Sequence, residues 1–369
     1  MKVILAGGGT GGHIYPALAV AQALRSQATS NDLELLYIGV RGRMDEEIVG
    51  RAGLPFAPVR AGALRVGSPI AALRGVLSLA IGTVEAWRLL GAFKPDAVFA
   101  TGGYASVPVG VAARCRRTAL LVYLPDVRPG WAVRLLSRLA TRIATTTERS
   151  LGELPAGKTV AAGYPVRESF WNTDRAYARD QLGLPADERV LLVAGASQGA
   201  RRINVAVSEQ LDELLTHCHV LHLTGEDSEA EMLSRRAALP EPIRERYHVR
   251  GYLDEMHDAM AAADLAVLRS GASVLGELPA AGLPAVLVPG VYEGGYDQRE
   301  NARYMEKQGA AVLLENESLD RLADTVGELL ADSDRLSAMS AAARRMARPD
   351  AAAEIAEMVR SIALEGRAA

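Results

Sequence analysis

The sequence predicts two doubly wound α/β domains, each with a parallel sheet covered by helices on both faces, facing each other across a cleft. Short apolar runs alternate with helical stretches along the whole chain. Several of these runs end in glycine, as strands do where they turn into a following helix. The length of 369 residues also favours two domains over one.

The apolar runs place five strands in each half of the chain. In the first half they are residues 2–8, 33–39, 97–103, 119–124 and 142–147; in the second they are 190–197, 219–225, 248–252, 265–271 and 285–290. Helices are predicted over residues 16–26 and 45–53, and three more follow the last strand. Glycine and proline at residues 163–166 mark the boundary between the domains.

Composition excludes several classes of protein. Hydrophobic residues make up 49% and charged residues 23%, which are the proportions of a globular chain rather than a disordered one. The two cysteines, Cys115 and Cys218, allow neither a disulfide framework nor a zinc site, and we expect both to be buried structural thiols in a reducing compartment. We also expect a soluble protein, because no apolar stretch reaches the ~20 residues of a membrane span and the start does not resemble a secretory signal.

The net charge of −3 conceals an uneven distribution of charge. Residues 1–160 carry 19 Lys and Arg against 10 Asp and Glu, whereas the remainder is acidic. Such an excess is either a solvated basic face or a surface attracted to an anionic partner. Nucleic acid is not expected as that partner, because aromatic residues for base stacking are not interleaved with the arginines.

A glycine-rich stretch, residues 7–12, lies where the first strand turns into the first helix. It satisfies the GxGxxG pattern of dinucleotide-binding folds. Those folds also need an acidic residue at the end of the second strand, where this chain has Arg41 and Arg43. An NADP-dependent oxidoreductase therefore stays open only as a distant alternative, and the five glycines favour a bulkier ligand.

His13 follows this stretch directly. A lone histidine is more often structural than functional. His13, however, borders the expected cleft at a strand-to-helix turn, which is where a general base would lie. We therefore interpret it as the candidate base.

Three further loops are expected at the carboxyl ends of strands, where ligands of such sheets bind. Residues 101–106 form either a tight turn or a binding loop. Residues 195–201 could bind an anion through backbone N–H groups and the Ser197 hydroxyl, although they lack the P-loop pattern. In residues 269–277, Ser273 is a plausible helix cap, and Glu277, one turn later, could accept both hydroxyls of a ribose.

Taken together and in order, these stretches resemble the MurG family of glycosyltransferases, which add N-acetylglucosamine to lipid I in peptidoglycan synthesis. The matching stretches are GGTGGHIYPALAVA, TGGYASVPVGVAAR, GYPVR, GASQGARRIN, RSGASVLGELPAAGLPAVLVP and DQRENA. The resemblance implies the GT-B fold, with two Rossmann-like domains. It assigns residues 1–164 to an acceptor and membrane-side domain and residues 165–349 to a UDP-sugar-binding domain, with a helix over 350–369 packed back on the first.

The resemblance also implies an inverting transfer from UDP-N-acetylglucosamine to the 4-hydroxyl of a lipid-linked acceptor. His13 is the implied base, with Asp126 in a base or orienting role beside it, and no metal or cofactor is implied because helix N-termini stabilise the UDP leaving group. Gly102, Gly103 and Tyr104 are assigned to the acceptor. The implied donor contacts are Thr10, Gly11, Gly12, Arg167, Ser197, Leu253, Ala272, Ser273, Val274, Leu275, Gly276, Glu277 on the ribose, and Gln298.

Residues 69–93 form an unusually apolar helical stretch flanked by Arg65, Arg74, Arg88 and Lys94. This stretch is either a core helix or a peripheral attachment to the anionic cytoplasmic face of the bacterial plasma membrane, where the lipid acceptor resides.

One departure from the family pattern keeps alternatives open. Where the family carries His-Glu-Gln-Asn, this chain has Tyr123, Leu124, Pro125 and Asp126. The chain could therefore glycosylate another lipid carrier. It could also be a UDP-N-acetylglucosamine 2-epimerase-like enzyme, or a UDP-sugar binder that has lost its activity, although the retained His13 counts against that last alternative.

Overall fold

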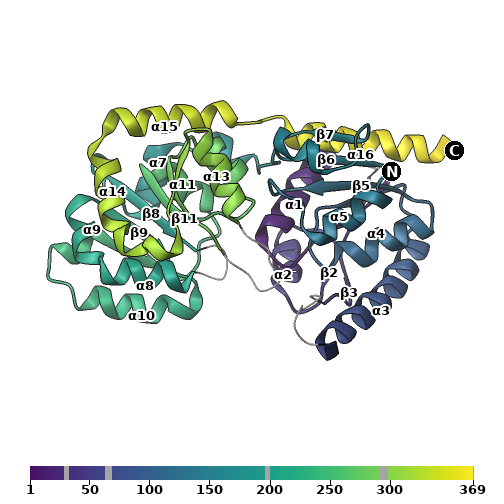
Figure 1. Cartoon of the computed structure of the whole chain (residues 1–369), viewed down its shortest axis with the longest axis horizontal. Helices are drawn as coiled ribbons and strands as arrows, with labels where there is room; N and C mark the ends of the chain where they lie inside the picture. Colours follow the sequence, from purple (N-terminus) through teal and green to yellow (C-terminus); the bar gives the residue numbers. More distant parts are fainter. Residues whose placement is uncertain (29–32, 63–68, 196–199, 291–297, 369) are drawn as a thin grey trace. The chain divides into compact units, whose positions relative to one another are not determined.

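The computed structural model describes residues 1–28, 33–62, 69–195, 200–290 and 298–368, and the chain forms two compact units (Figure 1). The first unit comprises residues 1–167 and 348–368, and the second comprises residues 168–290 and 298–347. The chain therefore passes into the second unit at residues 167–168 and returns at residues 347–348.

The first unit contains a parallel sheet of seven strands in the order β3-β2-β1-β4-β5-β6-β7. The strands are β1 (Lys2–Ala6), β2 (Glu34–Val40), β3 (Phe56–Val59), β4 (Ala97–Ala100), β5 (Ala119–Leu124), β6 (Arg142–Thr145) and β7 (Thr159–Ala161). The central strands are buried on both faces, which explains why they read as continuous apolar runs.

Helices cover both faces of this sheet. One hydrophobic cluster joins the sheet to α1 (Gly11–Ser26), α2 (Met44–Arg51) and the C-terminal α16 (Ala351–Ala368). The other joins it to α3 (Pro69–Phe93), α4 (Ser106–Cys115) and α5 (Trp131–Leu139). A 3₁₀ helix, η1 (Glu148–Glu153), precedes β7. Because α16 packs on α1, β4 and β5, the end of the chain completes the first unit.

The second unit contains a parallel sheet of six strands in the order β10-β9-β8-β11-β12-β13. The strands are β8 (Val190–Ala194), β9 (His219–Leu223), β10 (Tyr247–Arg250), β11 (Leu265–Arg269), β12 (Ala285–Val288) and β13 (Ala311–Leu313). The helices are α6 (Ser169–Asn172), α7 (Arg175–Leu182), α8 (Arg201–Glu209), α9 (Leu211–His217), α10 (Glu226–Ala237), η2 (Ile243–Arg246), α11 (Met256–Ala262), α12 (Val274–Ala281), α13 (Arg299–Lys307), η3 (Asn316–Arg321), α14 (Leu322–Ala331) and α15 (Ser333–Met346).

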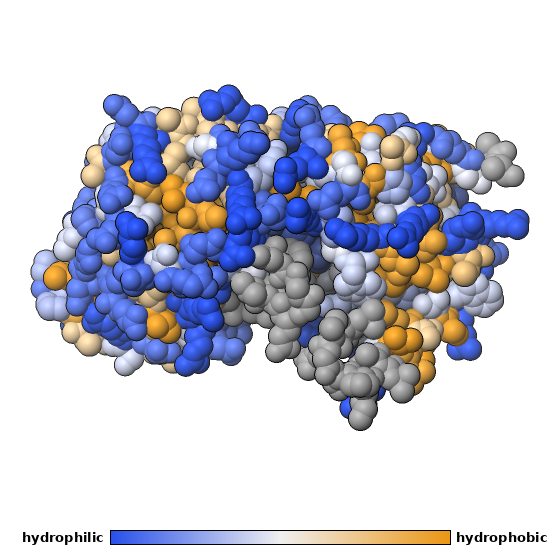
Figure 2. Space-filling view, viewed as in Figure 1, coloured by the Kyte–Doolittle hydropathy of each residue, from blue (hydrophilic) through white to orange (hydrophobic). Residues whose placement is uncertain are grey.

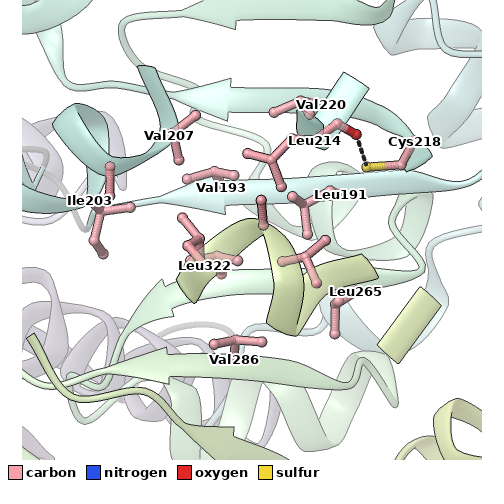
Figure 3. Close-up of a cluster of buried hydrophobic side chains, with 14 of the residues drawn as sticks. Leu191, Val193, Ile203, Val207, Leu214, Cys218, Val220, Leu265, Val286 and Leu322 are labelled. Carbon is pink, nitrogen blue, oxygen red and sulfur yellow. Dashed lines mark hydrogen bonds between the residues drawn. The ribbon is translucent and has the colours of Figure 1, made fainter. Parts of the chain in front are cut away.

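The core of the second unit is mainly aliphatic, in keeping with the scarcity of aromatic residues, and it includes one tyrosine, Tyr247. Figure 3 shows Leu191 and Val193 of β8 beside Ile203 and Val207 of α8, all of them buried. Leu322, at the start of α14, lies in the same cluster. Alternate residues of β8 point to the opposite face, where α11 packs on the strand and contacts α7 and α12.

Three strands were not predicted from the sequence, and all three are edge strands. They are β3, β7 and β13, each three or four residues long. An edge strand has one partner and stays partly exposed, and these three are too short to give a clear strand pattern.

The prediction that both cysteines are buried is wrong for Cys115, whose side chain is exposed. Cys115 is the last residue of α4, next to the exposed residues at the C-terminal end of that helix. Cys218 is buried as expected, and its thiol donates to the Leu214 carbonyl at 3.5 Å (Figure 3). Burial raises the pKa of the Cys218 thiol to about 12, which leaves it unreactive.

Candidate active site

Each sheet has a topological switch point, where the strand order reverses around its first strand. In the first unit β1 lies between β2 and β4, and in the second β8 lies between β9 and β11. Loops that leave such strands at their carboxyl ends diverge and open a crevice for a ligand. Most of the residues that the sequence predicted to be functional lie in the loops at these two switch points or in the first turns of the helices that follow them.

The switch point of the first unit joins the glycine loop, residues 7–12, to the loop after β4. Ala6 and Ala100 are paired in the sheet, and the Thr101 N–H donates to the Ala6 carbonyl at 2.9 Å. A Cβ on Gly103 would collide with the Gly8 carbonyl oxygen, so the two loops touch through their backbones. This contact therefore requires glycine at position 103, where φ is also positive at 76°.

Thr101, which is fully buried, holds His13 in two places. The Nδ1 atom of His13 lies 2.8 Å from the Thr101 carbonyl oxygen, and the Thr101 hydroxyl donates to the His13 backbone carbonyl at 2.6 Å. A carbonyl only accepts, so the neutral ring carries its proton on Nδ1 and keeps Nε2 as an acceptor. This is the tautomer that a general base needs, with its second nitrogen oriented by the protein.

The loop residues assigned to the acceptor differ in their surroundings. Gly102 lies against the His13 ring, where a Cβ would come within 3.1 Å of Cε1. Tyr104 is exposed, and its ring lies 6.2 Å from that of Trp131. An exposed aromatic pair beside a candidate base offers an apolar platform for a ligand.

The GYPVR segment brings two side chains to the start of α1. The Arg167 guanidinium stacks over the Tyr15 ring, with 4.4 Å between Cζ and the ring centroid. The Tyr164 hydroxyl lies 3.5 Å from the Gly12 carbonyl. Pro16 has no N–H to offer that carbonyl, so Tyr164 takes the place of the missing helical donor.

The Tyr123–Asp126 departure divides into two parts. Tyr123 is fully buried in β5, and its hydroxyl bonds Thr146 Oγ1 at 2.7 Å and donates to the Gly163 carbonyl at 3.1 Å. Burial raises the pKa of Tyr123 well above its usual value. Asp126, only 7% exposed, lies beyond the carboxyl end of β5. Tyr123 is thus part of the core, whereas Asp126 lies at the carboxyl edge of the sheet.

In the second unit, the loop from β11 to α12 brings the RSGAS and DQRENA motifs together. The buried Ser270 hydroxyl donates to the Gln298 carbonyl at 3.0 Å, and Asn301 Nδ2 donates to the Ser270 carbonyl at 3.0 Å. The Gln298 side chain accepts from the Gly290 N–H at 3.0 Å. A Cβ on Gly271 would lie 3.5 Å from Gln298 Nε2, so this amide borders the loop.

Helix α12 begins next to this loop and carries Glu277 in its first turn, 8% exposed. Ser273, at the position before the helix, makes no cap hydrogen bond with its side chain. The side chain of Ser273 therefore does not cap the helix, contrary to one of the two interpretations of this residue. In the first turn, which contains Val274, Leu275, Gly276 and Glu277 and is preceded by Ala272 and Ser273, the four backbone N–H groups donate to the carbonyls of residues 271–273. The positive end of the helix dipole lies at this turn.

The other implied donor contacts are less closely grouped. Leu253 is half-buried and follows β10, an edge strand two places away from β8. Thr10 is exposed, while Gly11 and Gly12 begin α1. Ser197 lies outside the described residues, as do Arg65 and much of the loop before Gln298.

A buried polar network that the sequence did not reveal supports the start of α8, next to residues 195–200. His222 Nε2 lies 3.1 Å from Asn204 Oδ1, and its Nδ1 lies 2.8 Å from the Tyr247 hydroxyl. Asn204 in turn donates to the Thr224 carbonyl at 2.8 Å. The network links α8 to β9 and β10, and Asn204 within the GASQGARRIN motif was the one available clue.

This network predicts acid sensitivity. Burial lowers the pKa of His222 to about 3, and burial likewise lowers the pKa of His248 to about 4. Between these values and about 6.5 the unfolded chain binds more protons than the folded one, so the free energy of unfolding should fall as pH falls. We expect a slope of about 1.4 kcal/mol per pH unit from His222 alone between pH 6 and 4.

The measurement is urea unfolding of the wild type and His222→Gln between pH 7.5 and 5. The variant should be less stable at pH 7.5 and should show a shallower pH dependence. Equal slopes in the two proteins would mean that His222 is not a buried neutral residue.

Two further side chains with roles at the first switch point were not identified from the sequence. Thr101 was noted only as part of a glycine turn, although it positions His13. Asp45 was assigned to a helix, yet its carboxylate accepts from the Gly9 N–H at 3.0 Å. Neither role has a local signal, because both depend on contacts between residues far apart in the sequence.

Comparison with known proteins gives a consistent family assignment. Residues 3–145 match the glycosyltransferase family 28 N-terminal domain, and residues 190–355 match its C-terminal domain. A UDP-N-acetylglucosamine–N-acetylmuramyl-(pentapeptide) pyrophosphoryl-undecaprenol N-acetylglucosamine transferase from Roseiflexus sp. is 39% identical, over 100% of this chain and 97% of its own length.

Solved structures agree on the fold. The crystal structure of Acinetobacter baumannii MurG matches with a TM-score of 0.72 and 24% identity, covering 98% of this chain and 99% of that one. A putative UDP-N-acetylglucosamine 2-epimerase from Listeria monocytogenes matches nearly as well, with a TM-score of 0.70, 16% identity, and coverage of 98% and 96%. The fold is thus shared by transferases and epimerases, and sequence similarity separates them. The chain belongs to the MurG family within glycosyltransferase family 28, and it is a glycosyltransferase with the GT-B fold.

Proposed function

We propose that the protein transfers N-acetylglucosamine from UDP-N-acetylglucosamine to the 4-hydroxyl of the N-acetylmuramyl group of lipid I, forming lipid II in peptidoglycan synthesis. The full-length similarity to the Roseiflexus transferase, whose name specifies these substrates, carries the choice of donor and acceptor. The orientation of His13 by Thr101 supports the chemistry, because it leaves one ring nitrogen available to take a proton.

The reaction is a single displacement. The acceptor O4 attacks the anomeric carbon as its proton passes to His13 Nε2, and the bond from that carbon to the diphosphate oxygen breaks. UDP leaves with the bonding electron pair, so the configuration at the anomeric carbon inverts. Asp126, beyond the end of β5, is proposed to orient either the acceptor or the imidazole of His13. Gly102, Gly103 and Tyr104 are proposed to contact the acceptor sugar.

The donor is proposed to bind mainly to the second unit. Glu277 accepts both ribose hydroxyls, while the positive end of the α12 dipole faces the diphosphate. Gln298 and Arg167 provide polar contacts to the donor. Leu253 packs on the uracil ring, and Ser197 belongs to the anion-binding loop. Thr10, Gly11 and Gly12 contribute the N–H groups at the start of α1. Together these groups stabilise the charge on the leaving UDP.

The first test is transfer of labelled N-acetylglucosamine to a panel of acceptors. Label should enter the lipid fraction with a lipid I analogue, and not with undecaprenyl phosphate or without acceptor. Transfer only to a different polyprenyl carrier would support the alternative raised by Tyr123–Asp126. UDP-N-acetylmannosamine formed from the donor alone would indicate an epimerase, and donor binding without any product would indicate a lost activity.

We further propose that α3 attaches the protein peripherally to the anionic cytoplasmic face of the bacterial plasma membrane. Within the described residues it is the one helix long and apolar enough to span a membrane, yet only 17% of its Arg74–Phe93 stretch is buried. Gly82, Ala86 and Leu90, four residues apart, are buried on its inner side. Figure 2 shows hydrophobic residues gathered where Figure 1 places α3.

The outer side of α3 combines apolar and basic groups. Val76, Leu77, Val84 and Trp87 are between 48% and 58% exposed. Arg74, Arg88 and Lys94 are exposed on or next to the same helix. Apolar side chains that enter the interface together with cations that meet lipid phosphates are the elements of peripheral attachment.

We expect Leu77→Glu to reduce binding to anionic vesicles by roughly tenfold or more, because it removes a buried leucine from the bound state. The measurement is co-sedimentation with vesicles of phosphatidylglycerol and phosphatidylethanolamine at low and high salt. Leu233→Glu, on exposed α10, is the matched control and should bind like the wild type. Equal binding by Leu77→Glu and the wild type, or no wild-type binding at low salt, would contradict this role for α3.

A further inference from the structure

The buried carboxylate of Asp45 lies beneath the glycine loop. Asp45 is in the first turn of α2, is 0% exposed, and follows β2, the neighbour of β1 in the sheet. Its Oδ1 accepts from the Gly9 N–H at 3.0 Å, and its Oδ2 accepts from the Val40 N–H at 3.1 Å. Burying a carboxyl group without hydrogen bonds is costly, and here both oxygens of Asp45 accept from backbone N–H groups.

Two glycines make room for this carboxylate. A Cβ on Gly8 would collide with Oδ2, and a Cβ on Gly39 would lie 3.1 Å from the same atom and 2.8 Å from the Phe56 ring. The loop and the end of β2 therefore close around Asp45 from both sides. An oxygen in this position fixes the plane of the peptide bond before Gly9.

The opposite flank of the loop is held by Thr101. Its hydroxyl donates to the His13 carbonyl at 2.6 Å, and its carbonyl faces His13 Nδ1 at 2.8 Å. Residues 9 to 13 thus run between two anchors, a carboxylate from α2 and a threonine from the end of β4. Between the anchors lie Gly11 and Gly12, whose N–H groups have no partner within α1 because they begin it.

We propose that Asp45 is a positioning residue for the transfer reaction: it fixes the glycine loop through Gly9 so that His13 and the N–H groups of Gly11 and Gly12 keep their catalytic geometry. This inference rests on the proposed function of His13. Asp45 does not serve to attract the donor, because a carboxylate beside an anionic diphosphate opposes binding. Because the donor is proposed to bind mainly to the second unit, loss of Asp45 should lower the catalytic rate more than the affinity for the donor.

The test is Asp45→Asn, compared with Glu47→Gln as a matched control. Asparagine has nearly the same shape, but it offers one acceptor oxygen and an NH₂ group that would oppose either the Gly9 or the Val40 N–H. Glu47 lies in the same turn of α2, is exposed and pairs with Arg51, so Glu47→Gln removes an equal charge without touching the loop.

Three quantities are measured for each protein: kcat with a lipid I analogue, the Kd for UDP, and amide hydrogen exchange in residues 7–13. For Asp45→Asn we expect kcat to fall between roughly tenfold and a hundredfold, because a displacement of about 1 Å in a catalytic group can cost that much in rate. We expect Kd to change less than about threefold, and exchange in residues 7–13 to accelerate while the sheet core stays protected. Glu47→Gln should match the wild type in all three.

Wild-type kcat together with wild-type exchange in Asp45→Asn would overturn the proposal. So would a loss of protection spread over the whole first unit, because Asp45 would then serve the fold rather than the loop. Asp45→Glu, which keeps the charge but moves the oxygens, should lower kcat as well, and full activity in this variant would also overturn it. If the wild type transfers no sugar, the proposed function fails, whereas the exchange measurement still reports on the anchoring of the loop.

Discussion

Replacement of His13 by alanine should lower the rate of sugar transfer by about a hundredfold or more, the usual contribution of a general base. The expected loss is confined to the chemical step, because the imidazole meets the acceptor hydroxyl rather than UDP. The Kd for UDP should therefore stay near that of the wild type. Steady-state kinetics with a lipid I analogue, combined with calorimetric titration of UDP, measure both quantities.

The matched control is His217→Ala, which removes an exposed histidine at the end of α9. It should transfer sugar at the wild-type rate. A His13→Ala variant that kept full activity would show that the base lies elsewhere, and Asp126, at the end of β5, would be the next residue to replace. A large rise in the Kd for UDP would instead assign His13 to the donor.

The second large effect is expected at Glu277. Replacement by glutamine removes the charge from a carboxylate that we expect to accept two ribose hydroxyls, and hydrogen bonds to charged groups contribute about 1.5–3 kcal/mol each. The Kd for UDP should therefore rise by roughly tenfold to a hundredfold. Glu328→Gln, at an exposed position of α14 in the same unit, is the control and should bind UDP normally.

A ribose analogue makes this test specific. The wild type should bind UDP more tightly than 2′-deoxy-UDP, and Glu277→Gln should lose most of that preference because the group that detects the hydroxyl has been weakened. If both proteins show the same preference, Glu277 does not contact the ribose, whatever the change in the Kd for UDP.

Much of the fold could be predicted from the sequence because the inner strands are buried on both faces. Runs such as residues 190–194 and 285–288 are apolar throughout, and a glycine or proline lies close after each. The edge strands β3, β7 and β13 could not be found in this way. Their pairing comes from the neighbouring strand rather than from their own composition.

The start of α1 illustrates a different difficulty. Two glycines and a proline argue against a helix before residue 16, yet α1 begins at Gly11. Tertiary hydrogen bonds stabilise this start of the helix. The Tyr164 hydroxyl donates to the Gly12 carbonyl, which Pro16 leaves without a helical donor, and the Thr101 hydroxyl donates to the His13 carbonyl. Local propensity cannot anticipate partners that are 88 and 152 residues away in the chain.

In the candidate site, too, some residues carry a signal in the sequence and others do not. Residues at the starts of helices that follow glycine-rich loops, such as His13 and Glu277, could be proposed from the sequence because the switch-point rule applies to any doubly wound sheet. Thr101 and Asp45, which hold the first of these loops, carry no motif of their own. Tyr123 was considered part of a functional run, and only the structure shows that its hydroxyl bonds to Thr146 and Gly163 within the core.

The most direct test of the central claim is the linkage in the product formed from UDP-N-acetylglucosamine and a lipid I analogue. Coupling constants and through-bond correlations in the nuclear magnetic resonance spectrum identify both the anomeric configuration and the acceptor oxygen. A single displacement assisted by His13 predicts a β-linkage to O4 of the muramyl sugar. An α-linkage, attachment at another oxygen, or an altered UDP-sugar without transfer would contradict it.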